Sequence, residues 1–264
     1  MIAVIVALKE EIHRWLEHQT FRCQGGSSLP RFYESSTETE VVVVEGGIGR
    51  QKAEATTIQT IESYHPSTII SAGFAGGARE GLRSGDLLLC QRLHALAEAP
   101  RIGGRLSSLE DSLESDHNLL DMAVKALKDA RVPHQRGACL TAPQFVADAP
   151  LKRWIGSSYL ADVIDMESYW VGRTARAKGI SLLALRSVLD PVEVSLPAFV
   201  SDVVTAQGKG SRKKALRYAV SRPAQIPELF RLSRQAHAAQ ETLSQALGTI
   251  ISSLKEEVVS LSSR

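Results

Sequence analysis

The feature that most constrains this chain is a run of four valines, a glycine turn and a helical segment that follow one another directly. Residues 41–71 read VVVVEGGIGRQKAEATTIQTIESYHPSTIIS. The valines predict a buried strand and the glycines a tight turn. Four residues behind the turn recur at helical spacing: Ala53, Thr57, Ile58 and Ile61. Pro66 ends the predicted helix and Thr68–Ser71 form the next strand, so the segment predicts a strand-helix-strand unit.

The same alternation of short aliphatic runs and helical segments continues along the chain. Strands are predicted at Ile2–Leu8, Val41–Val44, Thr68–Ser71, Asp86–Cys90 and Leu182–Arg186. Further helices are predicted at Asn118–Ala130 and Ser168–Lys178. This order predicts an α/β fold of three layers, with a mostly parallel central sheet flanked by helices.

The length of 264 residues predicts one domain, with a core at residues 1–205 and an extension at residues 206–264. The extension starts with a basic segment, because Lys209–Arg222 holds six basic residues and no acid. Such a cluster is ordinarily a solvated surface. Apolar residues then follow at spacings of three and four: Leu243, Leu247, Ile250, Leu254, Val258 and Leu261. This stripe predicts a C-terminal helix that packs on the body of the protein or on another subunit.

Composition excludes several classes of function. The formal net charge of +2 provides no global field for nucleic acid. The three cysteines lack CxxC spacing and the seven histidines show no close pair at metal-binding spacing, so neither a disulfide framework nor a metal site is predicted. The apolar N-terminus has no basic leader, and no apolar run approaches the roughly 18 residues of a membrane span. We therefore expect a cytoplasmic protein.

Ligands of open α/β sheets bind beyond the carboxyl ends of the strands, so the residues at these ends are the first candidates for a site. Glu11 follows the first strand, Asp190 follows the last, and Glu167 lies at the start of a predicted helix. Glycine turns follow two other strands, as GGIG and as SAGFAGG. Each residue alone has an ordinary structural role, since Glu often stabilises a helix start and Asp before proline often begins a turn. Together they predict an acid-lined pocket with glycine walls.

Six pieces in a fixed order carry a resemblance to a known family. They read IAVIVALKEEI, VVVVEGGIGRQKA, IISAGFAGG with RSGDLLL behind it, GACLTAPQFV, VIDMES and LLALRSVLD. Their order resembles the purine nucleoside and uridine phosphorylase superfamily, which includes the 5'-methylthioadenosine/S-adenosylhomocysteine nucleosidases. After Asp190 the chain looks like the hopanoid-associated phosphorylase branch, whose members are linked to adenine release from adenosylhopane.

The resemblance implies a role for several residues in breaking an N-glycosidic bond. Asp190 would protonate the purine at N7, Glu167 would bind the ribose hydroxyls, and Glu11 would activate water. Met166 would pack beneath the sugar, while Phe145 would stack on the purine and the Val146 backbone would read the base. The alternative for Met166, Phe145 and Val146 is an ordinary core position. Gly73, Phe74 and Ser168 complete the expected substrate contacts.

The sequence does not decide whether water or phosphate is the acceptor of the sugar. Gly47, Arg50 and Ser71 are the candidate anion-binding residues, because exposed amides and an arginine fork suit phosphate. Phosphorylases of this superfamily generally carry an arginine where this chain has Ser71, which disfavours phosphate. Phe74 replaces the small hydroxyl residue that is usual in nucleosidases, and its apolar surface suits a bulky 5' substituent.

The sequence thus predicts an enzyme that releases adenine from a 5'-substituted adenosine such as adenosylhopane. It would need no organic cofactor and no metal, with inorganic phosphate as a candidate co-substrate. We expect a small-molecule nucleoside partner, no nucleic acid, a homo-oligomer, and peripheral contact of the basic segment with an anionic membrane. The alternative function is a non-catalytic nucleoside-binding protein of the same fold.

Overall fold

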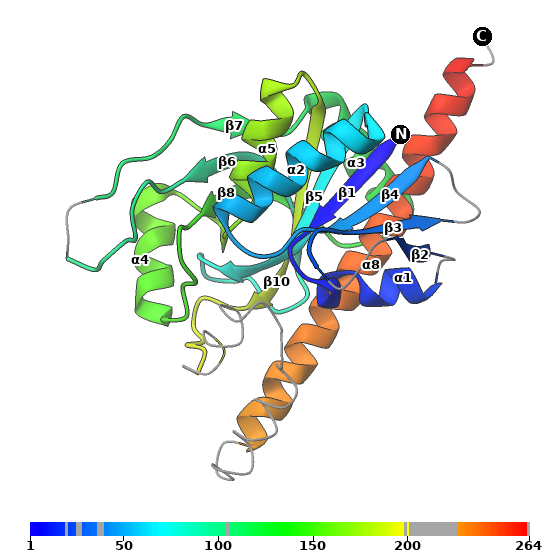
Figure 1. Ribbon diagram of the computed structural model, residues 1–264. Helices are drawn as coiled ribbons and strands as arrows, with labels where there is room; N and C mark the ends of the chain where they lie inside the picture. Colours follow the sequence, from blue (N-terminus) through cyan, green and yellow to red (C-terminus); the bar gives the residue numbers. More distant parts are fainter. Residues whose placement is uncertain are drawn as a thin grey trace.

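Strand β1 (Ile2–Val6) lies within the sheet and is buried on both faces in a computed structural model of the protein (Figure 1). Ile2, Val4 and Val6 enter one apolar core, whereas Ala3 and Ile5 enter a second core on the opposite face. A continuous apolar run is typical of such a doubly covered parallel strand. The structure describes residues 1–18, 21–24, 28–35, 40–103, 106–197, 200 and 226–262.

All five predicted strands are confirmed, and several are longer than predicted. The strands beside β1 are β2 (Phe21–Gln24), β3 (Arg31–Ser35), β4 (Val41–Glu45), β5 (Thr68–Gly77), β6 (Leu87–Ala95), β7 (Leu113–Glu114), β8 (Gln135–Thr141), β9 (Val163–Asp165) and β10 (Ser181–Asp190). The helices are η1 (Lys9–Glu11), α1 (His13–His18), α2 (Arg50–Tyr64), α3 (His117–Asp129), α4 (Ala149–Tyr159), α5 (Ser168–Ala177) and α8 (Ile226–Ser262). Helices α2, α3 and α5 confirm the three helices predicted for residues 1–205.

The expectation of a mostly parallel sheet is wrong, because the sheet is mixed. Strand β1 pairs in parallel with β4 and β5, and β5 with β10. However, β10 runs antiparallel to β6, and β9 runs antiparallel to β5. Since β6, β8 and β9 link β10 back to β5, these five strands close into a ring, from which β1, β4, β3 and β2 extend. Local patterns could not reveal these pairings, because they join segments far apart in the chain.

Helices cover both faces of the sheet and complete three layers (Figure 1). Helices α2 and α5 pack together on one face, whereas α8 contacts α1, α3 and β10 on the other. Leu243, Leu247, Ile250 and Leu254 of α8 are buried in the core beside β1, so this part of the predicted stripe packs on the body. The side chains of Val258 and Leu261, its last two members, lie outside the described part of the structure. The Lys209–Arg222 segment lies outside the described residues.

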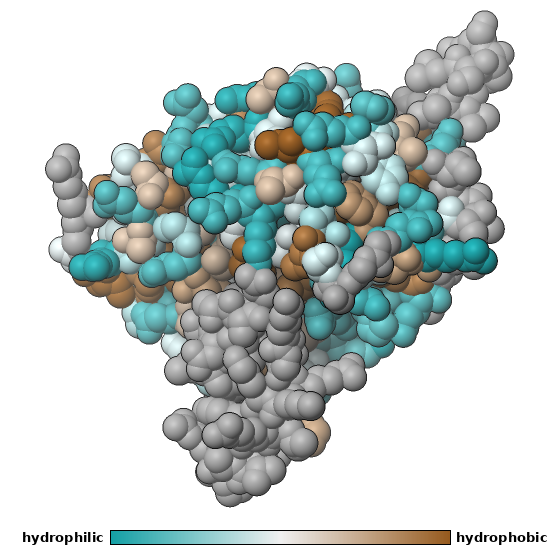
Figure 2. Space-filling view, in the orientation of Figure 1, coloured by the Kyte–Doolittle hydropathy of each residue, from teal (hydrophilic) through white to brown (hydrophobic). Residues whose placement is uncertain are grey.

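The face that carries α2 is mostly hydrophilic, with scattered apolar side chains (Figure 2). None of the described helices is long and apolar enough to cross a membrane.

Candidate active site

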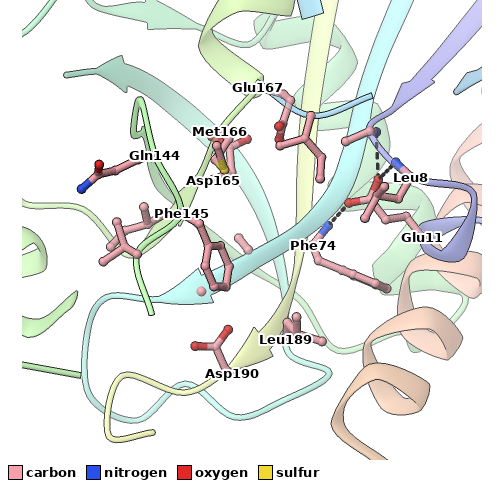
Figure 3. Close-up of a pocket in the computed structure, with 16 residues that line it drawn as sticks. Leu8, Glu11, Phe74, Gln144, Phe145, Asp165, Met166, Glu167, Leu189 and Asp190 are labelled. Atoms are coloured by element: carbon pink, nitrogen blue, oxygen red, sulfur yellow. Dashed lines mark hydrogen bonds between the residues drawn. The ribbon is translucent and has the colours of Figure 1, made fainter. Parts of the chain in front are cut away.

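A pocket opens where the carboxyl ends of β1, β5 and β10 meet (Figure 3). Six segments supply its walls, and they contribute Ala7, Leu8 and Glu11, then Ile48, Phe74–Gly76, Gln144–Val146, Ile164–Glu167 and Leu189–Asp190. Three carboxyl side chains thus face one cavity, those of Glu11, Glu167 and Asp190. The structure brings together these three acids that the sequence singled out, whereas the carboxyl of Asp165, which also belongs to the wall, is fully buried against Arg186.

Glu11 is held by backbone donors from two strand ends. Its Oε2 accepts hydrogen bonds from the amides of Ala7 and Leu8, both at 2.9 Å, and its Oε1 accepts one from Phe74 at 2.9 Å. Burial raises the pKa of this carboxyl, while the three amides and the Arg186 charge oppose the rise. A carboxyl poised in this way can accept a proton from water in the pocket.

Position 73 requires a glycine because there is no room for a side chain beside Glu11. A Cβ atom at this position would lie 2.7 Å from Glu11 Oε1. The absence of a side chain therefore lets β5 approach the carboxyl closely enough for the Phe74 amide to donate. Gly73 shapes the site through Glu11 and is not among the residues that line the pocket.

Glu167 precedes α5 and reaches toward the glycine turn after β4. Its Oε1 accepts a hydrogen bond from the Gly49 amide at 2.8 Å. Burial and then the neighbouring carboxyls of Asp165 and Glu11 raise its pKa to about 8, against the opposing effects of the Gly49 amide and Arg186. A developing positive charge in the pocket would favour the ionised form of this group.

Asp190 ends β10 on the other side of the pocket from Glu167, and its carboxyl points toward Phe145 (Figure 3). The side chain is 3% exposed, and Lys152 Nζ lies 2.5 Å from its Oδ2. Burial raises the pKa of Asp190 to about 6, and the Lys152 charge is the largest opposing effect. A carboxyl with this pKa keeps a protonated fraction of about one tenth at pH 7, far more than an ordinary Asp, and suits a general acid.

Apolar side chains form the rest of the wall. Phe74, Phe145, Val146 and Met166 all line the pocket, as the sequence predicted, and Leu8 and Leu189 add further apolar surface. Such a cavity, with few polar groups at fixed points, is typical of a small-molecule site.

Ser168, expected at the substrate, is buried behind the pocket. Its amide and hydroxyl both donate to Asp165 Oδ2, at 2.8 and 2.5 Å. Arg186 Nε donates to the same oxygen at 2.9 Å, and Thr141 donates to Asp165 Oδ1 at 2.7 Å. Ser168 thus helps to hold a buried Asp165–Arg186 ion pair.

The three candidate anion-binding residues are not brought together at the pocket. Ser71 accepts hydrogen bonds from Arg186 on both its carbonyl and its hydroxyl, at 2.9 and 3.0 Å. Arg50 stacks over Trp170, with 4.1 Å between its guanidinium carbon and the ring centre, and pairs with Glu54 at 3.3 Å. Gly47 and Ser71 line a small neighbouring cavity, but Arg50 does not.

The sequence analysis missed Lys152 and the whole of α4. A signal was present, because Asp148 caps this helix and Pro150 lies in its first turn. It also missed the pairing of Asp165 with Arg186, which no local pattern indicates. Among the described residues, no group of three or more His, Cys, Asp or Glu side chains could hold a metal ion.

Comparison with known proteins places these residues in context. The family model described as "Phosphorylase superfamily" matches residues 1–220. A 5'-methylthioadenosine/S-adenosylhomocysteine nucleosidase of Halalkalibacterium halodurans is 26% identical over 196 residues, covering 72% of this chain and 84% of the relative. The corresponding nucleosidase of Staphylococcus aureus strain Newman is 22% identical over 219 residues, covering 79% of this chain and 96% of the relative.

Solved structures share the fold at lower identity. The structure of futalosine hydrolase of Helicobacter pylori strain 26695 matches with a TM-score of 0.71 and 17% identity, covering 95% of this chain and 97% of that chain. A 5'-methylthioadenosine/S-adenosylhomocysteine nucleosidase of Neisseria meningitidis, in complex with methylthio-immucillin-A, matches with a TM-score of 0.69 and 18% identity, covering 95% and 97%.

Proposed function

Because this chain belongs to the phosphorylase superfamily, we propose that it is an enzyme that cleaves the N-glycosidic bond of a purine nucleoside. One observation carries the proposal: Glu11, Glu167 and Asp190 face one pocket from three different elements. The relatives named as nucleosidases support the same class of reaction.

The proposed mechanism assigns one task to each acid. Asp190 donates a proton to the departing base while the electrons of the glycosidic bond pass to that base. Glu167 binds the ribose hydroxyls and stabilises the positive charge that grows on the sugar ring. Glu11 takes a proton from the water that attacks the anomeric carbon. The stacking of Phe145 on the base and the packing of Met166 beneath the sugar complete the proposed contacts.

Water is the acceptor that the geometry favours. Arg186 donates hydrogen bonds to both Ser71 and Asp165, and Arg50 is stacked on Trp170. No lysine or arginine lines the pocket within the described part of the chain. A phosphate ion would therefore need these existing contacts to break.

A 5'-substituted adenosine is the proposed substrate, with adenine as the released base. Phe74, Leu8 and Leu189 line the pocket with apolar surface that would receive a 5' group. Adenosylhopane, which combines an adenosine with a large hydrocarbon, is our specific candidate. We also propose that the protein is cytoplasmic, that it forms a homo-oligomer and that it contacts a membrane peripherally.

The test is a substrate panel with phosphate as the variable. Purified protein is incubated with 5'-methylthioadenosine, adenosine, inosine and a 5'-alkyl adenosine, with and without phosphate, and free base is followed by chromatography. We expect adenine and a free sugar product without phosphate, and faster release from the 5'-alkyl substrate than from adenosine. Strict dependence on phosphate would refute water as the acceptor. Tight adenosine binding without any released base would favour the non-catalytic binding protein.

A further inference from the structure

Lys152 is a fully buried lysine beside the pocket. It lies on α4, at 0% exposure, and the apolar residues Ile155 and Ala149 of the same helix are buried with it. A lysine is almost never buried to this extent unless its charge is paired and its donors are satisfied. The environment of its ammonium group should therefore explain its presence.

Three acceptors converge on Lys152 Nζ. They are Asp190 Oδ2 at 2.5 Å, the Pro191 carbonyl at 2.7 Å and the Val194 carbonyl at 2.7 Å. An ammonium group has three N–H donors, so each donor has one acceptor and none remains to bind another group. The position of Nζ against Asp190 is thus fixed from three directions.

Only one oxygen of Asp190 takes part in this arrangement. Apart from the backbone amide of Asp190 itself, no further group of the described residues is recorded as a donor to the carboxyl, which lines the pocket. A carboxylic acid carries its proton on one oxygen, and the oxygen that already accepts from an ammonium group is the less favourable place for it. The proton of Asp190 is therefore directed to Oδ1.

We propose that Lys152 is a positioning residue for the acid of the reaction: its ammonium group occupies Asp190 Oδ2, so that the transferable proton is carried by Oδ1. This inference rests on the proposed function and names a residue that determines how the acid works. The two residues are 38 positions apart in the chain and meet only because α4 packs against the end of β10.

The step balances with groups already assigned. The Asp190 Oδ1–H bond breaks as a nitrogen of the base gains the proton, and the glycosidic bond electrons remain on the base. The carboxylate that results is stabilised by the Lys152 ammonium. The proton that Glu11 takes from the attacking water returns to solvent, and Asp190 regains a proton from solvent before the next turnover.

The charges around Asp190 isolate the effect of Lys152. Burial raises the pKa of Asp190, and Lys152 is the charged side chain that opposes this rise. The other charged groups of the neighbouring elements do not take part in this contact. On α4, Arg153 pairs with Glu80 and Asp148 caps the helix. Glu193 is exposed, while Glu11 and Glu167 lie on other walls of the pocket.

The test compares Lys152→Met with the matched control Arg153→Met, which removes a cation one position along the same helix. In Lys152→Met we expect kcat to fall by about tenfold to a hundredfold, with KM for the nucleoside changed less than about threefold. We also expect the alkaline limb of the pH profile to move upward by at least about one pH unit, because the carboxyl loses its cation. Arg153→Met should change neither quantity.

A second variant separates positioning from scaffolding. Lys152→Gln keeps N–H donors for the two carbonyls but lacks the charge, so the alkaline limb should move as it does in Lys152→Met. A fall in kcat with an unmoved limb in both variants would overturn the proposal, since Lys152 would then only hold residues 190–194. Unchanged kcat would overturn it as well.

A measurement without turnover keeps this inference distinct from the proposed function. The pH dependence of unfolding is compared between the wild type and Asp190→Asn, and between the same pair in the Lys152→Met background. The difference within each pair reports the pKa of Asp190, which we expect to be higher without Lys152. If the wild type releases no base, the proposed function fails, and equal pKa values in the two backgrounds would refute the coupling separately.

Discussion

Removal of Arg186 should destabilise the protein, because Asp165 would lose its buried counter-charge. Its guanidinium is 2% exposed and contacts Asp165 through Nε at 2.9 Å and through Nη2 at 2.8 Å. It also donates to the carbonyls of Ser71 and Leu185. The substitution Arg186→Met would leave the charge of Asp165 buried without a counter-charge.

The magnitude follows from the burial of the pair. Loss of one partner of a buried ion pair costs about 3–5 kcal/mol. Asp165 keeps three donors from Thr141 and Ser168, which places the expected cost near the lower end, at about 3 kcal/mol. For a chain of this size the loss corresponds to a fall in Tm of about 6–12 °C. The double variant Arg186→Met/Asp165→Asn removes both charges and should recover more than half of the loss.

Urea unfolding followed by tryptophan fluorescence, at one protein concentration, measures these free energies. The three tryptophans at positions 15, 154 and 170 report on different parts of the fold. A free energy of unfolding of Arg186→Met within about 1 kcal/mol of the wild-type value would refute the argument, because a buried unpaired carboxylate costs more than that. A double variant as unstable as the single one would show that packing, not charge, accounts for the cost.

The remaining predictions concern the pocket itself. Asp190→Asn should lower kcat by about 10²–10⁴-fold while a fluorescence titration still detects adenosine binding, since the amide cannot donate the acidic proton; undiminished turnover would exclude Asp190 as the acid. The pKa of Glu167 is raised from 4.5 to about 8, so its burial as a neutral group stabilises the fold fully below pH 4.5 and this contribution is lost as the pH rises through 8. Wild-type stability should therefore decline across this window by about 2–4 kcal/mol more than that of Glu167→Gln, and parallel Tm curves of the two proteins would contradict the assignment. Gly73→Ala should lower kcat by about tenfold or more, because its Cβ would displace Glu11 Oε1 from the Phe74 amide; a crystal structure of the variant with Glu11 unmoved would show the reasoning to be wrong. Phe74→Ser should reduce the preference for a 5'-alkyl adenosine over adenosine by about tenfold, as measured by the ratio of the two kcat/KM values, because the apolar surface is lost; an unchanged ratio would place the 5' group elsewhere.

The sequence by itself determined the elements whose signals are local. The four valines before GGIG, the helical spacing behind them and Pro66 predict the β4, α2 and β5 unit, because strand burial, glycine turns and helix ends each depend on neighbouring residues. The same local logic placed Glu11, Glu167 and Asp190 at strand ends or helix starts. Since such ends converge at one edge of a sheet, the three acids could be predicted to share a pocket.

Tertiary structure alone decided what each buried charge contacts. Lys152 meets Asp190 across 38 positions of the chain, and Arg186 meets Ser71 across 115. The mixed direction of the sheet likewise depends on β10 meeting β6 and on β9 meeting β5. A buried charge is stable only with a partner, and that partner can come from any part of the chain that packing brings near. Spacing along the sequence therefore places a carboxyl at a site, whereas the packed fold determines whether the carboxyl is protonated, which group it pairs with and what chemistry it can perform.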